Sequence, residues 1–133
     1  IMAAWALILF IVTMLPAIIF FLPCFLLDDP SKASWHRHVS RVWMWIYLHL
    51  IGCPLKVTGK EHFNAPTNYV IVCNHNSLMD VPVSTPFMPR PNKTIAKKSF
   101  AKIPLFGWIY TFGSVLVDRK SDESRRKSYE EMK

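Results

Sequence analysis

His75 and Asp80 stand five residues apart in the stretch VCNHNSLMD, residues 72–80. Five steps along a regular helix leave the two side chains about 140° apart, so they would point to different faces. They can meet if the histidine lies in the turn after a strand and the aspartate lies in the first turn of the next helix. The carboxylate would then bind one imidazole N–H and favour the imidazolium. The other ring nitrogen could remove a proton from an alcohol, which makes the pair a candidate general base.

The flanking residues predict the elements that would position this pair. The apolar, β-branched run YVIVC is typical of a buried central strand that ends just before it. The residues after the strand predict a short helix limited by Pro82. Strands that alternate with helices indicate an α/β fold with a mixed, largely parallel sheet flanked by helices. Strands are expected at residues 55–63, 69–73, 93–98 and 114–118, helices at 77–84 and 121–133, and an apolar helix or loop layer at 99–113.

The N-terminal part of the chain predicts a membrane segment. Residues 1–27 carry no charge, and as a helix they would extend about 40 Å, enough to cross a hydrocarbon core of about 30 Å. Pro16 and Pro23 predict a kink or a re-entrant turn. A second segment, rich in tryptophan, could pair with the first, lie flat in the interface or form a buried bundle helix. We expect a membrane-anchoring helical pair at 1–52 and the N-terminal part of an α/β domain at 53–133.

Charge and cysteine content narrow the range of partners. The net charge of +7, from 16 Lys and Arg against 9 Asp and Glu, suits anionic headgroups or phosphorylated substrates. No nucleic-acid motif is present, so no nucleic-acid partner is expected. Three cysteines without a C-x-x-C pair argue against a disulfide framework and favour a reducing compartment. His36 and His38 lack further ligands and predict a polar helix end, so no metal site is expected.

The segment NHNSLMD resembles the N-H-x-x-x-x-D motif of the glycerolipid acyltransferase family, typified by 1-acylglycerol-3-phosphate acyltransferases. Further along, AKKSFAKIPLFGW is similar to the family's lysine-containing segment before a Pro-x-x-Gly, and GSVLVDR is similar to its second block. The order and spacing of these pieces extend the resemblance from about residue 55 to residue 126. An N-terminal membrane helical pair also fits the family.

The resemblance implies a specific reaction. His75 would be the general base that deprotonates the free hydroxyl of a lysophospholipid such as lysophosphatidate, and Asp80 would orient the ring and stabilise its charge. The alkoxide would attack the thioester of acyl-CoA or acyl carrier protein and give phosphatidate and a free thiol. The transfer would be direct, without an acyl-enzyme. The thioester is a co-substrate, and no cofactor is expected.

The resemblance also implies residues that bind the substrate. Asn76 and Ser77 lie beside the pair. Arg119 would bind the substrate phosphate, because a guanidinium forks onto phosphate oxygens. Lys97 would add positive charge, although ordinary solvated surface is the alternative for it, and Gly113 would permit close approach of the backbone.

The family's third block, Glu-Gly-Thr-Arg, does not occur in the sequence, and both ends look cut. We therefore expect either a partial chain whose C-terminal part is missing or the loss of a phosphate-binding arginine. The resemblance implies location at the inner (cytoplasmic) membrane, contact with membrane lipids and a catalytic part that faces the cytoplasm. Two alternatives stay open: an acyltransferase for another acceptor, such as a lipid A precursor or ornithine lipid, and a non-catalytic membrane-anchored lipid-binding or scaffold protein.

Overall fold

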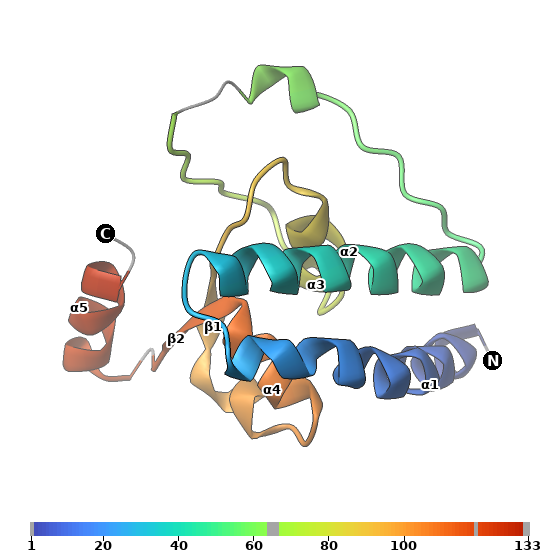
Figure 1. Cartoon of the computed structure of the whole chain (residues 1–133), viewed down its shortest axis with the longest axis horizontal. Coiled ribbons are helices and arrows are strands. Elements are labelled where there is room, and N and C mark those ends of the chain that lie inside the picture. The colour runs from blue at the N-terminus through green and yellow to red at the C-terminus, as the bar shows by residue number, and fades with distance from the viewer. Residues whose placement is uncertain (1, 64–66, 119, 132–133) are drawn as a thin grey trace.

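The structure, a computed structural model, describes residues 2–63, 67–118 and 120–131. Figure 1 shows the arrangement of its helices and strands, which are α1 (Met2–Phe21), α2 (Ser31–Leu50), α3 (Asp80–Ser84), β1 (Thr94–Lys97), α4 (Phe106–Phe112), β2 (Ser114–Val117) and α5 (Asp122–Glu131). Four short 3-10 helices also occur in the described residues: η1 (Leu22–Phe25), η2 (Lys60–His62), η3 (Thr85–Phe87) and η4 (Lys98–Lys102).

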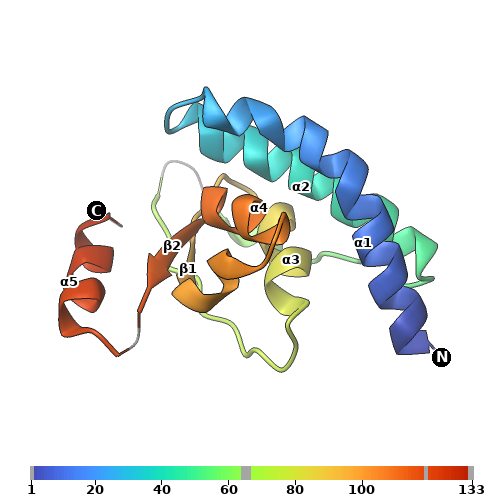
Figure 2. The same ribbon diagram turned by 90° about the horizontal axis from the view of Figure 1, so that it is seen from below.

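Helices α1 and α2 pack side by side in antiparallel directions (Figures 1 and 2). The indole Nε1 of Trp43 donates to the hydroxyl of Thr13 at 3.0 Å, which ties the two helices together. Fully burying one large apolar side chain stabilises the fold by about 1.5–3 kcal/mol. A helical pair is present where one was predicted, and its place in a membrane stays a prediction. The side chains buried along this hairpin are Met14, Ala17, Phe21, Val39, Trp43, Met44, Tyr47 and Leu48.

The two prolines of the N-terminal segment lie in different elements. Helix α1 contains Pro16 and continues to Phe21, and Pro23 lies in η1. The chain turns back towards α2 after η1, so Pro23 lies at the turn of the hairpin (Figure 1). That this turn lies in a membrane stays a prediction. In the described part of the chain, one helical stretch, Met2–Phe25, is long and apolar enough to cross a membrane. Core helices of soluble proteins and signal sequences can share this property.

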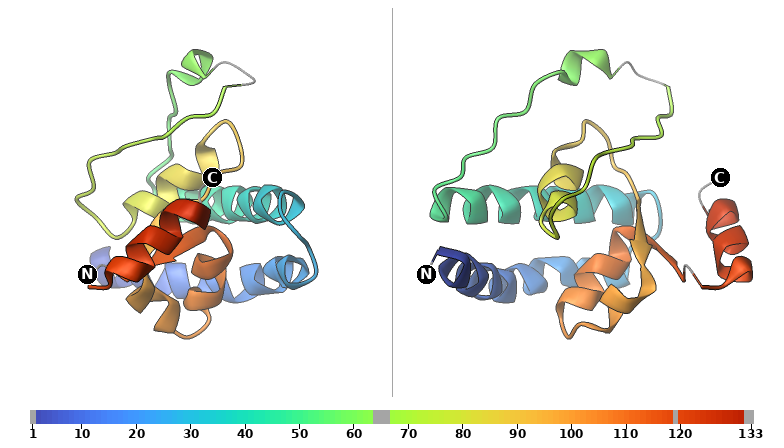
Figure 3. Two further views of the ribbon diagram at one scale, coloured as in Figure 1. Left: turned by 90° about the vertical axis from the view of Figure 1, so that its left-hand side faces the viewer. Right: turned by 180° about the vertical axis from the view of Figure 1, so that it is seen from behind.

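The sheet has two strands in the described residues. β1 and β2 run parallel, with Thr94 opposite Ser114 and Lys97 opposite Val117, and α4 lies in the connection between them. The predicted strands at 93–98 and 114–118 and their parallel pairing are confirmed. Helix α5 confirms the last predicted helix, and it lies at the end of the molecule away from the N-terminus (Figure 3).

Two predicted strands are not formed. Residues 69–73, expected to be a buried central strand, form no strand, and 94% of Val70 and 89% of Val72 is exposed. Residues 55–63 instead contain η2, which follows Gly59 in a left-handed conformation with φ of 81°. A β-branched run becomes a buried strand only where a neighbouring strand supplies hydrogen bonds and covers its faces. The described chain places no such neighbour alongside it, so the sheet is smaller than predicted.

Candidate functional site

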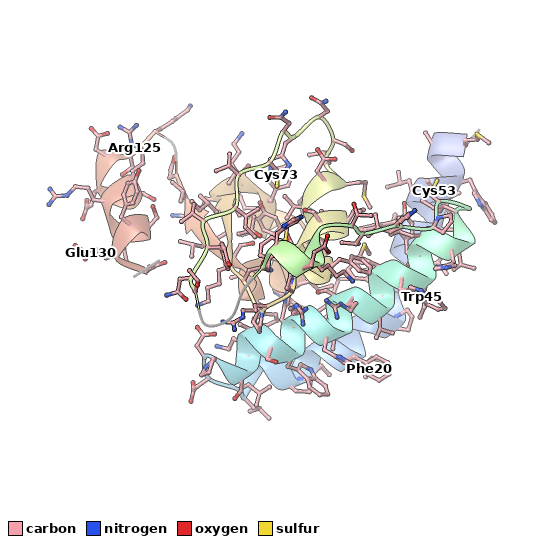
Figure 4. All side chains as sticks on the ribbon, turned by 90° about the horizontal axis from the view of Figure 1, so that it is seen from above. Phe20, Trp45, Cys53, Cys73, Arg125 and Glu130 are labelled. Atoms are coloured by element: carbon pink, nitrogen blue, oxygen red, sulfur yellow. The ribbon has the colours of Figure 1, made fainter. Side chains whose placement is uncertain are left out.

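The histidine and the aspartate meet at the start of α3. Asp80 is the first residue of that helix, and His75 lies in the irregular segment that leads to it. Cys73, labelled in Figure 4, marks this segment two residues before the histidine. The Nδ1 atom of His75 lies 3.6 Å from Oδ2 of Asp80, with 50% of the histidine side chain and 32% of the aspartate side chain exposed. The predicted geometry, a histidine before the helix and an aspartate in its first turn, is therefore present.

Backbone amides hold the carboxylate of Asp80. Its Oδ2 atom accepts hydrogen bonds from the N–H of Asn76 at 2.7 Å and of Ser77 at 2.9 Å. The hydrogen bond from Ser77, then that from Asn76, and to a smaller degree the facing His75 hold the pKa of Asp80 below its usual range. The carboxylate is thus an anion at neutral pH, and it cannot serve as the acid of the pair.

The ring of His75 is oriented by this anion. Because Nδ1 faces the carboxylate, the other ring nitrogen, Nε2, points away from it, and half of the side chain is open to solvent. A neutral imidazole with its proton on Nδ1 leaves Nε2 as an acceptor. The arrangement can therefore take a proton from a hydroxyl placed at Nε2 and stabilise the resulting imidazolium.

Asn76 and Ser77 contact the His75–Asp80 pair through their backbone N–H groups. Their N–H groups bind Asp80, and the hydroxyl of Ser77 accepts the N–H of Met79 at 3.1 Å. At the other end of α3, the hydroxyl of Ser84 donates to the carbonyl of Asp80 at 2.6 Å. Local hydrogen bonds thus fix the loop before the helix. The role of Asn76 and Ser77 in substrate binding stays a prediction.

The other predicted site residues lie apart from one another. Lys97 is exposed at the carboxyl end of β1. Gly113 precedes β2, and its carbonyl accepts the N–H of Thr94, the first residue of β1. Lys97 pairs with Val117, four residues beyond Gly113, so the two positions are at opposite ends of the strand pair, roughly 13 Å apart along the strands. The structure therefore does not bring Lys97 and Gly113 together, and Arg119 lies outside the described residues.

Gly113 approaches a histidine side chain. A Cβ atom at this position would collide with Cε1 of His36. The Nε2 atom of His36 lies 2.9 Å from the carbonyl oxygen of Ile109, and its ring packs 5.1 Å from that of Phe21. The expectation that His36 marks a polar helix end is thus wrong, because the ring fills the contact between α2 and α4. Nothing in the sequence connects residues so far apart.

Replacing Gly113 with alanine is expected to destabilise the fold by about 1–3 kcal/mol, because the imidazole of His36 must leave its position. Thermal denaturation measures this. The matched control is the double replacement Gly113→Ala with His36→Ala, in which the added methyl group meets no ring. Equal stability of Gly113→Ala and the natural protein would contradict the close approach.

A small, mainly apolar cavity lies behind α3. Its volume is about 60 Å³, and its walls include Val81 and Pro82 of α3 together with residues of α2 and α4. His75 and Asp80 are not among the residues that line it. The pair therefore faces the surface while the other side of α3 covers the cavity. Across residues 2–63, 67–118 and 120–131, no group of three or more His, Cys, Asp or Glu side chains is close enough to hold a metal.

Comparison with known proteins gives consistent matches. The family described as Acyltransferase matches residues 54–133. A 1-acyl-sn-glycerol-3-phosphate acyltransferase of Cocos nucifera is 34% identical over 103 residues, which cover 76% of this chain and 32% of that protein. A protein of the same name from Saccharomyces cerevisiae is 28% identical, over 72% of this chain and 31% of its own length. A chloroplastic one from Arabidopsis thaliana is 26% identical, over 75% of this chain and 28% of its own length.

The chain spans about a third of the length of these curated relatives. No solved structure gives a significant match.

Proposed function

This chain belongs to the acyltransferase family, and from that premise we propose that its protein moves a fatty acyl group onto the free hydroxyl of lysophosphatidate and forms phosphatidate. The relatives named for this reaction support the choice of acceptor. The single observation that carries the proposal is the pair itself: an ionised carboxylate, held by two backbone amides, lies 3.6 Å from the Nδ1 atom of a half-exposed histidine.

The chemistry follows from the orientation of the ring. The acceptor hydroxyl lies at Nε2 of His75 and gives up its proton as its oxygen attacks the carbonyl carbon of the thioester of acyl-CoA or acyl carrier protein. The C–O ester bond forms, the C–S bond breaks, and the leaving thiolate takes the proton back from the imidazolium. Asp80 stabilises the imidazolium between these two events. A general base of this kind contributes about 10²–10⁴-fold to the rate.

The reaction is tested with the whole protein that carries this chain. Purified protein in lipid is incubated with 1-acyl lysophosphatidate and an acyl-CoA, and in a second series with an acylated carrier protein. Phosphatidate and free thiol should form in equal amounts with at least one donor. If neither donor supports transfer to lysophosphatidate, while another lyso-lipid is acylated, the acceptor is wrong. If no lipid is acylated, the enzymatic proposal fails.

The surface of the helical hairpin supports a place at the membrane. Phe20 of α1 and Trp45 of α2 both point outward on the side of the hairpin away from the sheet (Figure 4). Large apolar side chains exposed along a whole helix are unusual on a soluble monomer and mark contact with lipid or another partner. We place this face in or on the bilayer. The large apolar side chains exposed along α1 are Met2, Trp5, Leu7, Ile8, Ile11, Val12, Leu15, Ile19 and Phe20.

Replacing Ile11 and Ile19 with lysine is expected to weaken membrane binding by more than tenfold, because a charged side chain in hydrocarbon costs about 2.5–3.5 kcal/mol. Both side chains are exposed, so the fold should tolerate the change. Flotation of the whole protein with liposomes measures the effect. The matched control adds the same two units of positive charge on α5, by replacing Glu123 and Glu130 with glutamine, and should float as the natural protein does. Unchanged flotation of the α1 variant would show that this face does not enter the membrane.

A further inference from the structure

We propose that Arg37 and Arg41 of α2 are positioning residues of this site, which hold the chain directly after α3 and thereby keep the His75–Asp80 pair, whose local geometry the amides of Asn76 and Ser77 fix, in place against α2. The proposal rests on the proposed function, because it gives the two arginines a part in that reaction. In the described residues, their hydrogen bonds go to the backbone of residues 86–88. They would therefore act through the segment that they bind and not on the substrate.

Both guanidinium groups hold the same short stretch of backbone. Arg37 donates through Nε to the carbonyl oxygen of Met88 at 2.9 Å, and its Nη2 binds the same oxygen. Arg41 donates through Nε to the carbonyl of Pro86 at 3.0 Å, and its Nη2 lies 3.3 Å from the carbonyl oxygen of Met88. The guanidinium of Arg41 also lies 5.9 Å from the centre of the Phe87 ring. The guanidinium groups of Arg37 and Arg41, one helical turn apart, thus bind residues 86–88 to α2.

These contacts are not part of a salt bridge. Among the described residues, no carboxylate lies within ion-pair distance of either guanidinium. Ordering two long side chains on uncharged carbonyls costs rotamer entropy, and hydrogen bonds from a charged donor, at about 1.5–3 kcal/mol each, offset that cost. Arginine suits this task because its planar fork reaches two carbonyls at once, whereas lysine offers a single point of contact.

The fastened segment is continuous with the helix that carries the aspartate. Helix α3 has five residues, and η3 begins directly after it at Thr85. So short a helix does not hold its own orientation and depends on its contacts with the rest of the fold. The segment before it, from residue 67 to residue 79, forms no strand or helix, and Met79 at its end packs against the hydrophobic core. The arginines therefore add polar contacts to the apolar packing of Met79 and Val83, and together these contacts hold α3 beside the hairpin (Figures 1 and 3).

A second anchor joins the same segment to the sheet. The hydroxyl groups of Thr85 and Thr94 lie 3.3 Å apart, which connects η3 to β1. The side-chain amide of Asn92 donates to the carbonyl of Thr85 at 3.2 Å. Without the arginines the segment would keep these contacts and pivot about them, so the fold would survive while α3 changed its direction. A displacement of about 1 Å at a catalytic group can lower a rate by about a hundredfold.

The test replaces Arg37 and Arg41 with lysine, singly and together, in the whole protein. We expect the double variant to lower kcat by about ten- to a hundredfold and to leave KM for the acyl donor and the thermal denaturation temperature near their natural values. The amides of Asn76 and Ser77, which bind Asp80, should exchange hydrogen faster, while those in the middle of α2 should not. The matched control is Arg126→Lys on α5, where the side chain is exposed, and it should change none of these quantities.

The same experiment distinguishes a merely structural role of the arginines from a failure of the proposed function. If the lysine variants lose thermal stability and folded protein, while kcat per folded molecule is unchanged, the arginines are merely structural and the inference is overturned. Unchanged kcat and unchanged amide exchange overturn it as well. The natural protein and the variant His75→Ala are measured in the same assay as the arginine variants. If those two transfer acyl groups equally well, the proposed function itself fails, whatever the arginine variants do.

Discussion

The variant His75→Ala is expected to lose about 10²–10⁴-fold in kcat for acyl transfer to lysophosphatidate, because it removes the group that takes the proton from the acceptor hydroxyl. Without a base, the neutral hydroxyl must attack the thioester unaided. The side chain is half exposed, and within residues 2–63, 67–118 and 120–131 its one ion-pair contact is with Asp80, so the fold and the membrane binding should stay intact. The measurement is the initial rate of thiol release at saturating concentrations of both substrates.

A second histidine offers a matched control. His62 in η2 also faces a carboxylate, with Nε2 3.6 Å from Oε1 of Glu61, and 81% of its side chain is exposed. The variant His62→Ala removes the same kind of pair at the same distance, away from the start of α3. It should keep the natural rate. Equal losses in the two variants would mean that the histidine of the motif has no special part in the reaction.

The variant Asp80→Asn is expected to lower kcat by at least about a hundredfold, because an amide does not stabilise the imidazolium and leaves the ring free to take the wrong tautomer. The replacement keeps the shape of the side chain, and its amide oxygen can still accept the N–H groups of Asn76 and Ser77. Substrate binding should therefore change little, so the loss should appear in kcat and not in KM. A rate close to that of the natural protein would remove Asp80 from the mechanism.

The same variant should also change how stability depends on pH. The pKa of Asp80 is lower in the folded protein than in the unfolded chain. The unfolded state therefore binds more protons between the two values, and stability rises with pH there. The contribution of Asp80 is complete above the ordinary carboxyl pKa of about 3.9 and is lost as the pH falls through the lower folded value. In Asp80→Asn this part of the acid dependence should be absent from denaturation curves measured between about pH 2 and pH 6.

The features that the sequence could predict are those set by residues close together in the chain. The pair depends on six consecutive residues, and its geometry follows from a polar turn before a short helix, so the motif was enough to place His75 beside Asp80. Strands β1 and β2 are short β-branched runs joined by a helical connection, a pattern that predicts a parallel pair. The helical hairpin likewise follows from a long apolar segment at 1–27 and a shorter apolar run at 42–52, with a charged stretch between them.

What the sequence could not predict depends on contacts between distant residues. The run at 69–73 has the composition of a buried strand, yet burial requires a neighbour that composition does not supply. The contact of His36 with Gly113, and those of Arg37 and Arg41 with residues 86–88, join parts of the chain more than 40 residues apart. No local pattern marks them, because arginine on the face of a helix is most often solvated.

The most direct test of the account is a double-mutant cycle on His75 and Asp80, measured as the rate of phosphatidate formation by the whole protein. If the aspartate acts only by orienting and stabilising the imidazole, it has nothing left to do once the ring is gone. The double variant His75→Ala with Asp80→Asn should then be no slower than His75→Ala alone. A double variant slower than His75→Ala by the full factor that Asp80→Asn causes on its own would show that the two residues act independently, and would contradict the account.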